Sequence, residues 1–396
     1  MPRTPPLILL ALLTGCVAQE GGFVQEYTGP PGSGEPNLAA TRDGRVVLTW
    51  LEPLGADSHA LRVAVREPDG WSEPSDVVSG GAFFVNWADF PSLTVLDDRT
   101  WLVHWLETTA ETPYAYHVKL AFSQDEGASW SEPLVPHRDS SATEHGFASV
   151  VPWGLSGAAL IWLDGRGMGA VDPTHGEPVG DMMLRFTTVT RGGELSDDVA
   201  IDPRVCECCA TALARTGRGL LAAYRDRSPE EIRDIAVTRY ERGTWSEPVV
   251  VAEDGWHITG CPVNGPQLAA SGDAAVLAWF TAAGERPRVH ISFSTDGGRS
   301  WRAPVQVDDG SPLGRVDVVM MVDGSAVVGW LEATGAGAEV RARRFTARGS
   351  RGRSYIVGGT DSARAAGFPR MVRVADETLF AWTVPERGIR VVSRRF

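Results

Sequence analysis

The chain is short of long apolar segments, of positive charge and of helical periodicity. After residues 7–13, no segment is long and apolar enough to cross a membrane as a helix. The formal net charge of -13 argues against nucleic acid as a partner, because few basic groups are available to displace counterions from phosphates. The same charge disfavours an anionic membrane surface. No long segment repeats its apolar residues about every 3.6 positions, so helices are not the main element.

The N-terminus does contain a basic start and a short apolar run, residues 7–13. The run is too short to span a bilayer and is typical of a signal peptide, which predicts export. The letters LTGC at 13–16 resemble the lipobox of bacterial lipoproteins, which implies lipidation of Cys16; an ordinary secretory signal is the alternative. Val17 replaces the aspartate of inner-membrane lipoproteins and favours the outer membrane. We expect a signal peptide at 1–15, a tether at 16–22 and a cell-envelope protein whose only membrane contact is its lipid.

Short apolar runs that end in an aromatic residue recur about every 50 to 60 residues along the rest of the chain. The aromatic residues are Trp50, Trp105, Trp162, Tyr224, Trp279, Trp330 and Trp382. An apolar run precedes each of them, and an alternating run and a tight turn follow most of them. Four short strands per unit, separated by Gly/Asp turns, predict a propeller blade. The sequence therefore predicts one all-β propeller domain over 23–396 with seven four-stranded blades, or six if the irregular unit 147–203 is not a blade.

The last unit has room for only three strands before the chain ends at residue 396. We expect the N-terminal segment 23–28, FVQEYT, to supply the fourth, outer strand. This pairing would close the ring with both chain ends in one blade and leave no open sheet edge.

Two turns after third strands share the pattern Ser-x-Asp-x-Gly-x-x-Trp. The residues are Ser123, Asp125, Gly127 and Trp130 in one turn, and Ser294, Asp296, Gly298 and Trp301 in the other. The Asp is expected to accept turn amides, the Gly to take a positive φ and the Trp to pack between blades. The pattern matches the Asp-box, so residues 23–396 resemble the Asp-box (BNR-repeat) propellers of the sialidase superfamily. That resemblance implies a functional face opposite the Asp-boxes, and the motif also occurs in non-hydrolytic relatives.

One face of a propeller collects the loops before the inner strands and after the second strands, and such loops carry binding residues. We expect this face to form a polar funnel for a glycan or a small anionic ligand. The predicted ligand-binding residues are Asn86, His145, Arg225, Asn264, Arg315, Asp317 and Arg370. Glu144 lies in the same set of loops. The alternative is that these charges are solvated and pair with one another.

The sialidase resemblance implies three arginines that bind a carboxylate, a tyrosine nucleophile and acidic partners. Arg225, Arg315 and Arg370 are candidates for the carboxylate, because a planar guanidinium suits it. The candidate catalytic residues are Asp89, Glu107, Glu332 and Tyr224. The family's Phe/Tyr-Arg-Ile-Pro motif is absent, and Tyr224 occupies the aromatic position of its repeat. Three hypotheses follow: a sialidase-type glycosidase for sialylated or other acidic glycans, a non-catalytic glycan- or protein-binding propeller, and a metal- or redox-dependent surface protein.

The third hypothesis rests on two loops that precede neighbouring blades and are expected to meet. Their cysteines are Cys206, Cys208, Cys209 and Cys261. In an oxidising compartment, a disulfide from Cys261 to one of the other three is the expected result. A copper or zinc site, with His257 or His145 as a further ligand, is the alternative, although Cys-x-Cys-Cys is not a standard zinc spacing. A free thiol pair is the third possibility, and no other cofactor is expected.

Overall fold

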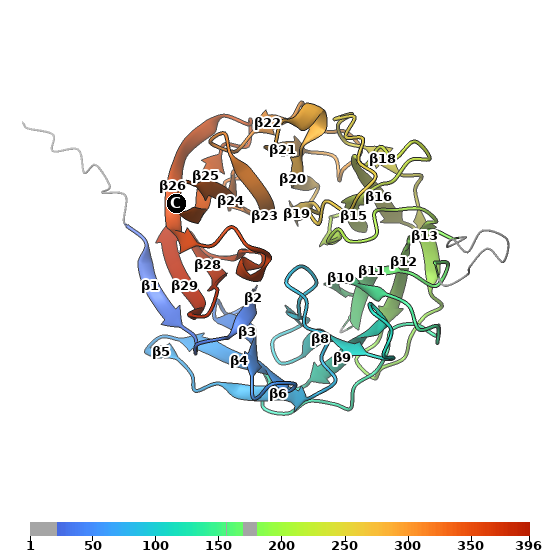
Figure 1. Cartoon of the computed structure of the whole chain (residues 1–396), viewed down its shortest axis with the longest axis vertical. Coiled ribbons are helices and arrows are strands. Elements are labelled where there is room, and N and C mark those ends of the chain that lie inside the picture. The colour runs from blue at the N-terminus through green and yellow to red at the C-terminus, as the bar shows by residue number, and fades with distance from the viewer. Residues whose placement is uncertain (1–21, 156, 169–179) are drawn as a thin grey trace, which may run out of the picture.

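The computed structural model describes residues 22–155, 157–168 and 180–396, so the expected signal peptide and Cys16 lie outside the described residues. These residues form seven antiparallel sheets around one axis, and the chain runs once around the ring (Figure 1). Two short 3-10 turns, η1 (Ala283–Glu285) and η2 (Arg364–Ala366), interrupt the loops. The predicted all-β propeller with seven blades is confirmed, and six blades are excluded. No helix within the described ranges is long and apolar enough to span a membrane.

The first three blades follow one another along the chain. Blade 1 contains β2 (Gly34–Ala40), β3 (Val46–Pro53), β4 (His59–Glu67), β5 (Gly70–Trp71) and β6 (Ser75–Gly80). Blade 2 contains β7 (Ser92–Val95), β8 (Trp101–Thr108) and β9 (Tyr116–Ser123). Blade 3 contains β10 (His145–Trp153), β11 (Gly157–Asp164), β12 (Met183–Val189) and β13 (Val199–Asp202). Blade 2 departs from the predicted four strands, because its outer edge is reduced to an isolated bridge between Leu120 and Leu134.

The next three blades repeat the pattern. Blade 4 contains β14 (Ala212–Arg215), β15 (Leu220–Arg225), β16 (Ile235–Glu241), β17 (Thr244–Trp245) and β18 (Val249–Val250). Blade 5 contains β19 (Gln267–Ser271), β20 (Ala274–Thr281), β21 (Arg288–Ser294) and β22 (Val305–Gln306). Blade 6 contains β23 (Pro312–Met320), β24 (Ala326–Thr334), β25 (Gly337–Phe345) and β26 (Arg351–Thr360).

Blade 7 closes the ring with strands from both ends of the chain. It contains β27 (Arg370–Val374), β28 (Glu377–Val384), β29 (Gly388–Arg395) and, on its outer edge, β1 (Val24–Thr28). β1 runs antiparallel to β29, with Val24 opposite Ser393 and Thr28 opposite Arg390. The predicted closure is confirmed, and Figure 1 shows β1 beside β29 at the ring perimeter.

The core consists of seven hydrophobic clusters, each between two adjacent blades. The second strand of a blade faces a neighbour on both sides, so its residues form an apolar run rather than an alternation. Trp105 and Trp162 illustrate this burial, with at most 1% of each residue exposed. Burying such an indole removes a large apolar area from water, and this explains the aromatic residue in every repeat.

The two Ser-x-Asp-x-Gly-x-x-Trp turns form the same local hydrogen bonds. The Ser123 hydroxyl donates to Asp125 at 2.9 Å and accepts from the Gly127 amide at 2.7 Å, and Gly127 has φ of 87°. In the second turn, the Gly298 amide donates to the Ser294 hydroxyl, the Ser300 amide donates to Asp296, and Gly298 has φ of 82°. Trp130 packs against the cluster between blades 1 and 2, and Trp301 against the cluster between blades 4 and 5.

Candidate functional site

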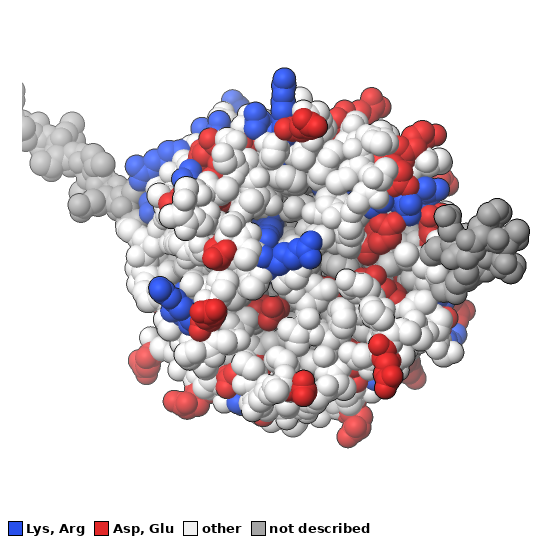
Figure 2. Space-filling model, in the orientation of Figure 1, with Lys and Arg blue, Asp and Glu red and all other residues white. Residues whose placement is uncertain are grey.

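Two cavities lie near the ring axis and share the lining residues Ala88 and Phe147. The upper cavity, of about 300 Å³, lies among the loops that precede the inner strands. It is lined by Asn86, Trp87, Ala88, Tyr114, Glu144, Phe147, Glu207, Cys208, Cys261, Val263 and Arg364. The axial cavity, of about 240 Å³, lies among the inner strands themselves. Viewed down the axis, one basic patch lies near the centre of the molecule, and other basic side chains and most acidic ones lie around the rim (Figure 2).

A disulfide between Cys208 and Cys261 joins the loops before blades 4 and 5 at the wall of the upper cavity. Its Cα atoms are 6.1 Å apart, and the expected bridge from Cys261 is thereby confirmed. Cys206 and Cys209 remain thiols in the structure; both are buried, with their sulfur atoms 2.7 Å apart. Only two of the four thiols are therefore free to act as ligands for copper or zinc, and neither His257 nor His145 lies in either cluster that contains these cysteines.

A buried hydroxyl group connects the two cavities. The Tyr116 hydroxyl lies 3.0 Å from the carboxylate oxygen Oδ2 of Asp89, which lines the axial cavity. It also lies 2.7 Å from Oε1 of Glu144, which lines the upper cavity. We call these three residues the relay. They come from three places in the sequence, and a β-bridge between Tyr116 and Glu144 fixes two of them side by side.

The proton count of the relay requires a protonated carboxyl group. A hydroxyl has one proton to donate, whereas Tyr116 contacts two carboxyl groups. Asp89 Oδ2 already accepts the Phe147 amide at 2.8 Å and is therefore an acceptor. The consistent arrangement is that Tyr116 donates to Asp89 and that Glu144 carries a proton, which it donates to the Tyr116 oxygen.

Burial favours the protonated form of both relay acids. Desolvation raises the pKa of Asp89 to about 7, against hydrogen bonds from Phe147 and Tyr116 that lower it. Desolvation likewise raises the pKa of Glu144 to about 7, with a further increase from the negative charge of Asp89. A carboxyl whose pKa lies near neutrality can both give and accept a proton under physiological conditions.

Gly146 makes room for the relay. A Cβ at this position would clash with Asp89 Oδ2 and would lie 2.6 Å from Cε2 of Tyr116. The next residue, Phe147, has φ of 51° and points its amide at Asp89. The local sequence Glu144-His-Gly-Phe therefore builds one half of the relay, and only glycine fits in its third position.

The second carboxyl group of the upper cavity has a different environment. Glu207 lies between Cys206 and Cys208 and accepts hydrogen bonds from Arg227 at 2.5 Å and from Arg233 at 2.6 Å. These are charge-assisted contacts, which a carboxylate makes. Arg233 is almost fully buried, so its guanidinium is a fixed partner. The upper cavity thus presents one carboxyl group bonded to a phenol and one carboxylate bonded to two guanidinium groups.

The remaining wall of the upper cavity is suited to a polar ligand with a flat face. Trp87 and the exposed Tyr114 contribute aromatic surface, and Asn86 contributes an amide whose oxygen accepts from the Ala88 amide. Arg364 lies in η2 with its guanidinium carbon 5.9 Å from the Trp87 ring. Among the described residues, no carboxylate forms an ion pair with Arg364. A free cation and aromatic faces in one cavity fit an anionic sugar better than an apolar ligand.

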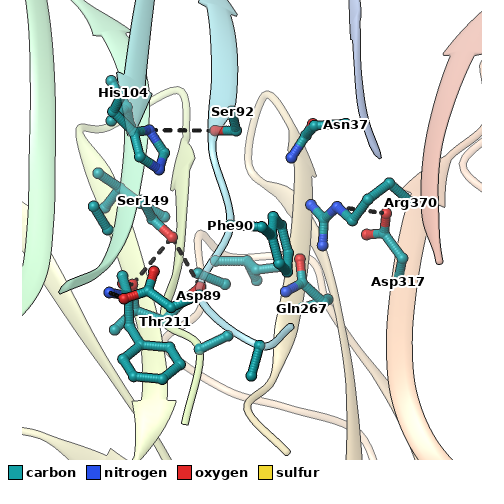
Figure 3. A pocket seen from close by; sticks show the side chains of 18 of the residues that line it. Asn37, Asp89, Phe90, Ser92, His104, Ser149, Thr211, Gln267, Asp317 and Arg370 are labelled. Carbon is teal, nitrogen blue, oxygen red and sulfur yellow. Dashed lines mark hydrogen bonds and ion pairs between the residues drawn. The ribbon is translucent and has the colours of Figure 1, made fainter. Parts of the chain in front are cut away.

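The axial cavity collects three of the predicted residues (Figure 3). Asp89 lies on one wall near Ser149 and Thr211, and Arg370 and Asp317 lie together on the opposite wall. Arg370 Nε is 3.6 Å from Asp317 Oδ2, and Asp317 also accepts the Met371 amide at 2.7 Å. This cavity is lined mostly by residues of the inner strands, and it contains the Asp89 side of the relay.

The predicted catalytic residues Glu107 and Glu332 line neither cavity. Each accepts a hydrogen bond from the indole of the tryptophan two residues earlier, at 2.9 Å from Trp105 and 2.6 Å from Trp330. Glu52 and Asp164 make the same contact with Trp50 and Trp162. The acids at the second-strand ends therefore satisfy buried indoles, and this accounts for their presence in the repeat.

The predicted Tyr224 nucleophile also faces away from both cavities. The residue is fully buried in the cluster between blades 3 and 4, and its hydroxyl donates to Asp202 at 2.6 Å. Burial and the charge of Asp202 raise its pKa far above the usual range. Tyr224 is thus a structural member of its repeat.

The three predicted carboxylate-binding arginines are not presented to one cavity. Arg225 is 1% exposed, and its guanidinium donates to the main-chain carbonyls of Asn264, Arg233 and Phe280. Arg315 donates to the carbonyls of Ala363 and Gly367, and burial lowers its pKa to about 10. Only Arg370 lines a cavity, the axial one. Arg225 and Arg315 therefore stabilise loops through hydrogen bonds to main-chain carbonyls.

Two further predicted ligand residues have internal partners. Asn264 accepts the Arg315 amide at 2.7 Å and donates to the carbonyl of Leu313. His145 is fully buried and contacts Asp139 and the carbonyl of Thr143. Of the predicted ligand-binding residues, Asn86 alone faces the upper cavity.

Sequence reasoning missed Tyr116 and Glu207. Tyr116 begins a third strand and looks like any other alternating strand residue. Glu207 is marked in the sequence only as the residue between two cysteines, so the cysteine loop is the sequence signal that could have identified it.

The fold and the site together define a seven-bladed β-propeller with a two-carboxyl cavity on its loop face. No family model matches the sequence, and no curated protein matches it. The structure is similar to a protein of unknown function from Dyadobacter fermentans, with a TM-score of 0.52, 14% identity, and 96% of this chain and 99% of that chain covered. It is also similar to an α-L-arabinofuranosidase from Fusarium graminearum, with a TM-score of 0.53, 13% identity and coverage of 95% and 98%.

A sialidase, NanB from Streptococcus pneumoniae, matches less closely, with a TM-score of 0.48, 8% identity and coverage of 88% and 82%. At these identities, the two similarities with TM-scores above 0.5 show a shared fold alone. They do not transfer an activity to this chain, because unrelated functions occur on one fold.

Proposed function

We propose that this protein is a glycoside hydrolase that cleaves an acidic sugar from the end of a glycan in the upper cavity. The observation that carries the proposal is that two carboxyl groups, Glu144 and Glu207, line the same cavity with different hydrogen-bond partners. Cleavage of a glycosidic bond needs such a pair. A cavity of about 300 Å³ holds about one sugar unit, which favours the end of a glycan over a long polymer segment.

The hydrogen-bond partners assign the two roles. Glu144 turns the proton that it donates to Tyr116 in the free site towards the oxygen of the leaving sugar, and transfers it there as the glycosidic bond breaks. Glu207 remains a carboxylate against Arg227 and Arg233 and stabilises the positive charge that develops on the anomeric carbon. Water then supplies the new hydroxyl group, and its proton returns to Glu144.

The preference for an acidic sugar is supported by Arg364 and by the aromatic walls. A guanidinium binds a carboxylate with two parallel hydrogen bonds. The exposed Tyr114 offers a face for the apolar side of a sugar ring, whereas Trp87 already stacks on Phe368 and contacts the Arg315 guanidinium. Sialic acids and uronic acids both have this combination of a carboxylate and a ring, so both belong in the test.

A panel of aryl glycosides tests the proposal: a sialoside, a glucuronide, a galacturonide and an arabinofuranoside. We expect turnover of at least one acidic member, with Glu144→Gln and Glu207→Gln each lowering kcat/KM by about 10² to 10⁴. Arg364→Ala should lower kcat/KM for the acidic substrates more than for the neutral arabinofuranoside. Glu332→Gln is the matched control, because this acid bonds an indole outside the cavity. Binding of glycans without turnover of any substrate would assign the chain to the non-catalytic class instead.

We also propose that the protein is exported and anchored through a lipid on Cys16, on the basis of the apolar run and the LTGC sequence before it. Metabolic labelling with a fatty acid should mark the wild type but not Cys16→Ser, and the variant should leave the membrane fraction. Persistence of the label in Cys16→Ser would contradict the proposal.

A further inference from the structure

Three histidines form a buried cluster directly behind the relay, outside both cavities. His117 lies at the start of β9, His137 in the loop that follows blade 2, and His145 at the start of β10. One ring nitrogen from each lies within 4.8 Å of the others. His145 is fully buried, and His137 is 5% exposed.

Main-chain carbonyls of one loop lie against two of these rings. His137 Nδ1 lies 3.1 Å from the carbonyl of Asp139, and His145 Nδ1 lies 3.2 Å from the carbonyl of Thr143. A carbonyl that accepts from Nδ1 fixes the tautomer and leaves the lone pair on Nε2, which is the usual arrangement around a metal-binding histidine.

Two of the three Nε2 atoms have no protein partner. The Nε2 atoms of His117 and His137 are buried, and neither has a hydrogen-bond partner within the described ranges. The third, His145 Nε2, lies 2.9 Å from the carboxylate of Asp139. A buried polar atom without a partner costs about 1–3 kcal/mol, and such atoms in a native structure call for an unseen partner.

We propose that His117, His137 and His145 bind a divalent transition-metal ion, with zinc the best match, and that the carboxylate of Asp139, 2.9 Å from His145 Nε2, moves in as the fourth ligand. Three imidazoles and a carboxylate suit a tetrahedral Zn²⁺ ion with no open position, which is typical of a structural site. Zn–N bonds of about 2.0–2.1 Å place tetrahedral ligand atoms about 3.3 Å apart. Binding therefore draws the nitrogens together from their 4.8 Å spread and tilts the His137 and His145 rings, now stacked at 4.1 Å.

The position of the ion explains what it would do. His117 follows Tyr116 in the sequence, and His145 follows Glu144, so each histidine adjoins a member of the relay. Successive residues of a strand point to opposite sides. An ion behind the strands would therefore hold Tyr116 and Glu144 together from the outside. This consequence rests on the proposed function, whereas the metal site itself does not.

Metal analysis of the purified chain tests the site without any substrate. We expect about one equivalent of zinc per chain after dialysis against Zn²⁺, and a lower Tm after removal by a chelator. Replacement by Co²⁺ should give the visible absorption of a tetrahedral cobalt site in the wild type, a readout that requires no variant to fold. His117→Gln and His137→Gln should each weaken binding about tenfold or more.

Two control variants separate this site from the alternatives. His257→Gln alters an exposed histidine beside the cysteine loops, and the double variant Cys206→Ser/Cys209→Ser removes the free thiols; both should keep the ion. Loss of the ion in the cysteine variant would overturn the proposal. So would a wild type that binds none of Zn²⁺, Co²⁺, Ni²⁺ and Cu²⁺ and whose Tm does not change when they are added. An ion-loaded protein with no glycosidase activity contradicts the proposed function alone, and an active protein without an ion contradicts the metal site alone.

Discussion

Replacing Asp89 by asparagine tests whether the wall between the two cavities contains a carboxyl group that resists ionisation. The variant keeps the size of the side chain. Its amide oxygen can still accept from the Phe147 amide and the Tyr116 hydroxyl, because both donors reach the same oxygen, Oδ2. The one property that Asp89→Asn removes is the ability to lose a proton.

The expected magnitude follows from the pKa of Asp89, which burial raises from 3.8 to about 7. The folded state binds this proton more tightly than the unfolded state, so the stabilisation by the proton is complete below about pH 4 and is lost as the pH rises towards 7. A shift of about three pKa units at about 1.4 kcal/mol each sets a ceiling of about 4 kcal/mol. Glu144 titrates in both proteins, but Asp89→Asn removes the negative charge that raises the pKa of Glu144, so the comparison reports the two relay acids together.

Urea unfolding followed by tryptophan fluorescence measures the effect between about pH 4 and pH 8. The free energy of unfolding of Asp89→Asn relative to the wild type should rise by about 2–4 kcal/mol over this range. Asp98→Asn, on the exposed side of a surface turn, should show no such trend. A constant difference in the free energy of unfolding between the wild type and Asp89→Asn from pH 4 to pH 8 would show that Asp89 does not titrate near neutrality.

Three further changes probe the scaffold around the site. Gly146→Ala should lower the free energy of unfolding by about 2–4 kcal/mol through its clash with the relay, whereas Gly260→Ala, with open space around it, should be near neutral in the same unfolding assay. The double variant Cys208→Ser/Cys261→Ser opens a loop of 53 residues, and its free energy of unfolding should fall by up to about 4 kcal/mol. An unchanged urea midpoint would contradict this. Glu332→Gln should lower the free energy of unfolding by about 1–2 kcal/mol and leave kcat/KM unchanged. A loss of activity without a loss of stability would make Glu332 a catalytic candidate again.

The ring could be predicted from the sequence because its core requirement is repeated seven times. Every second strand lies between two blades, so every repeat needs an apolar run with a large aromatic residue near its end. The outer strands face a neighbour on one side only and leave a weaker pattern. This is why β17, β18 and β22 are only two residues long and why blade 2 ends in a single bridge.

The candidate site was predicted less well, and the acids at the second-strand ends show why. Charge and a place at a strand end predict a catalytic role for Glu107 and Glu332, but both accept a hydrogen bond from the indole two residues earlier. The same tryptophan–acid pair recurs in other repeats. An active site occurs once in a chain, so a feature that repeats with the blades is evidence for a structural role.

The residues that do form the upper cavity occur where the repeat is broken. The cysteine loop was recognised from its unusual composition, and it does lie at the cavity wall. Tyr116 and His137 carry no such mark, because their partners come from other segments and only the fold brings them together. A single sequence contains no information on those contacts beyond residue type.

The arrangement of cross-links around the two carboxyl groups argues for a common purpose. Catalytic groups must be held to within about 0.5 Å, and loops alone rarely achieve this. Glu207 lies in a loop, but the next residue, Cys208, is bonded covalently to the loop before blade 5. Glu144 also lies at the end of a loop, and the next residue, His145, belongs to the proposed metal site. Each carboxyl group is therefore adjacent to a cross-link, as expected if both need a fixed position that the strands of a propeller do not provide.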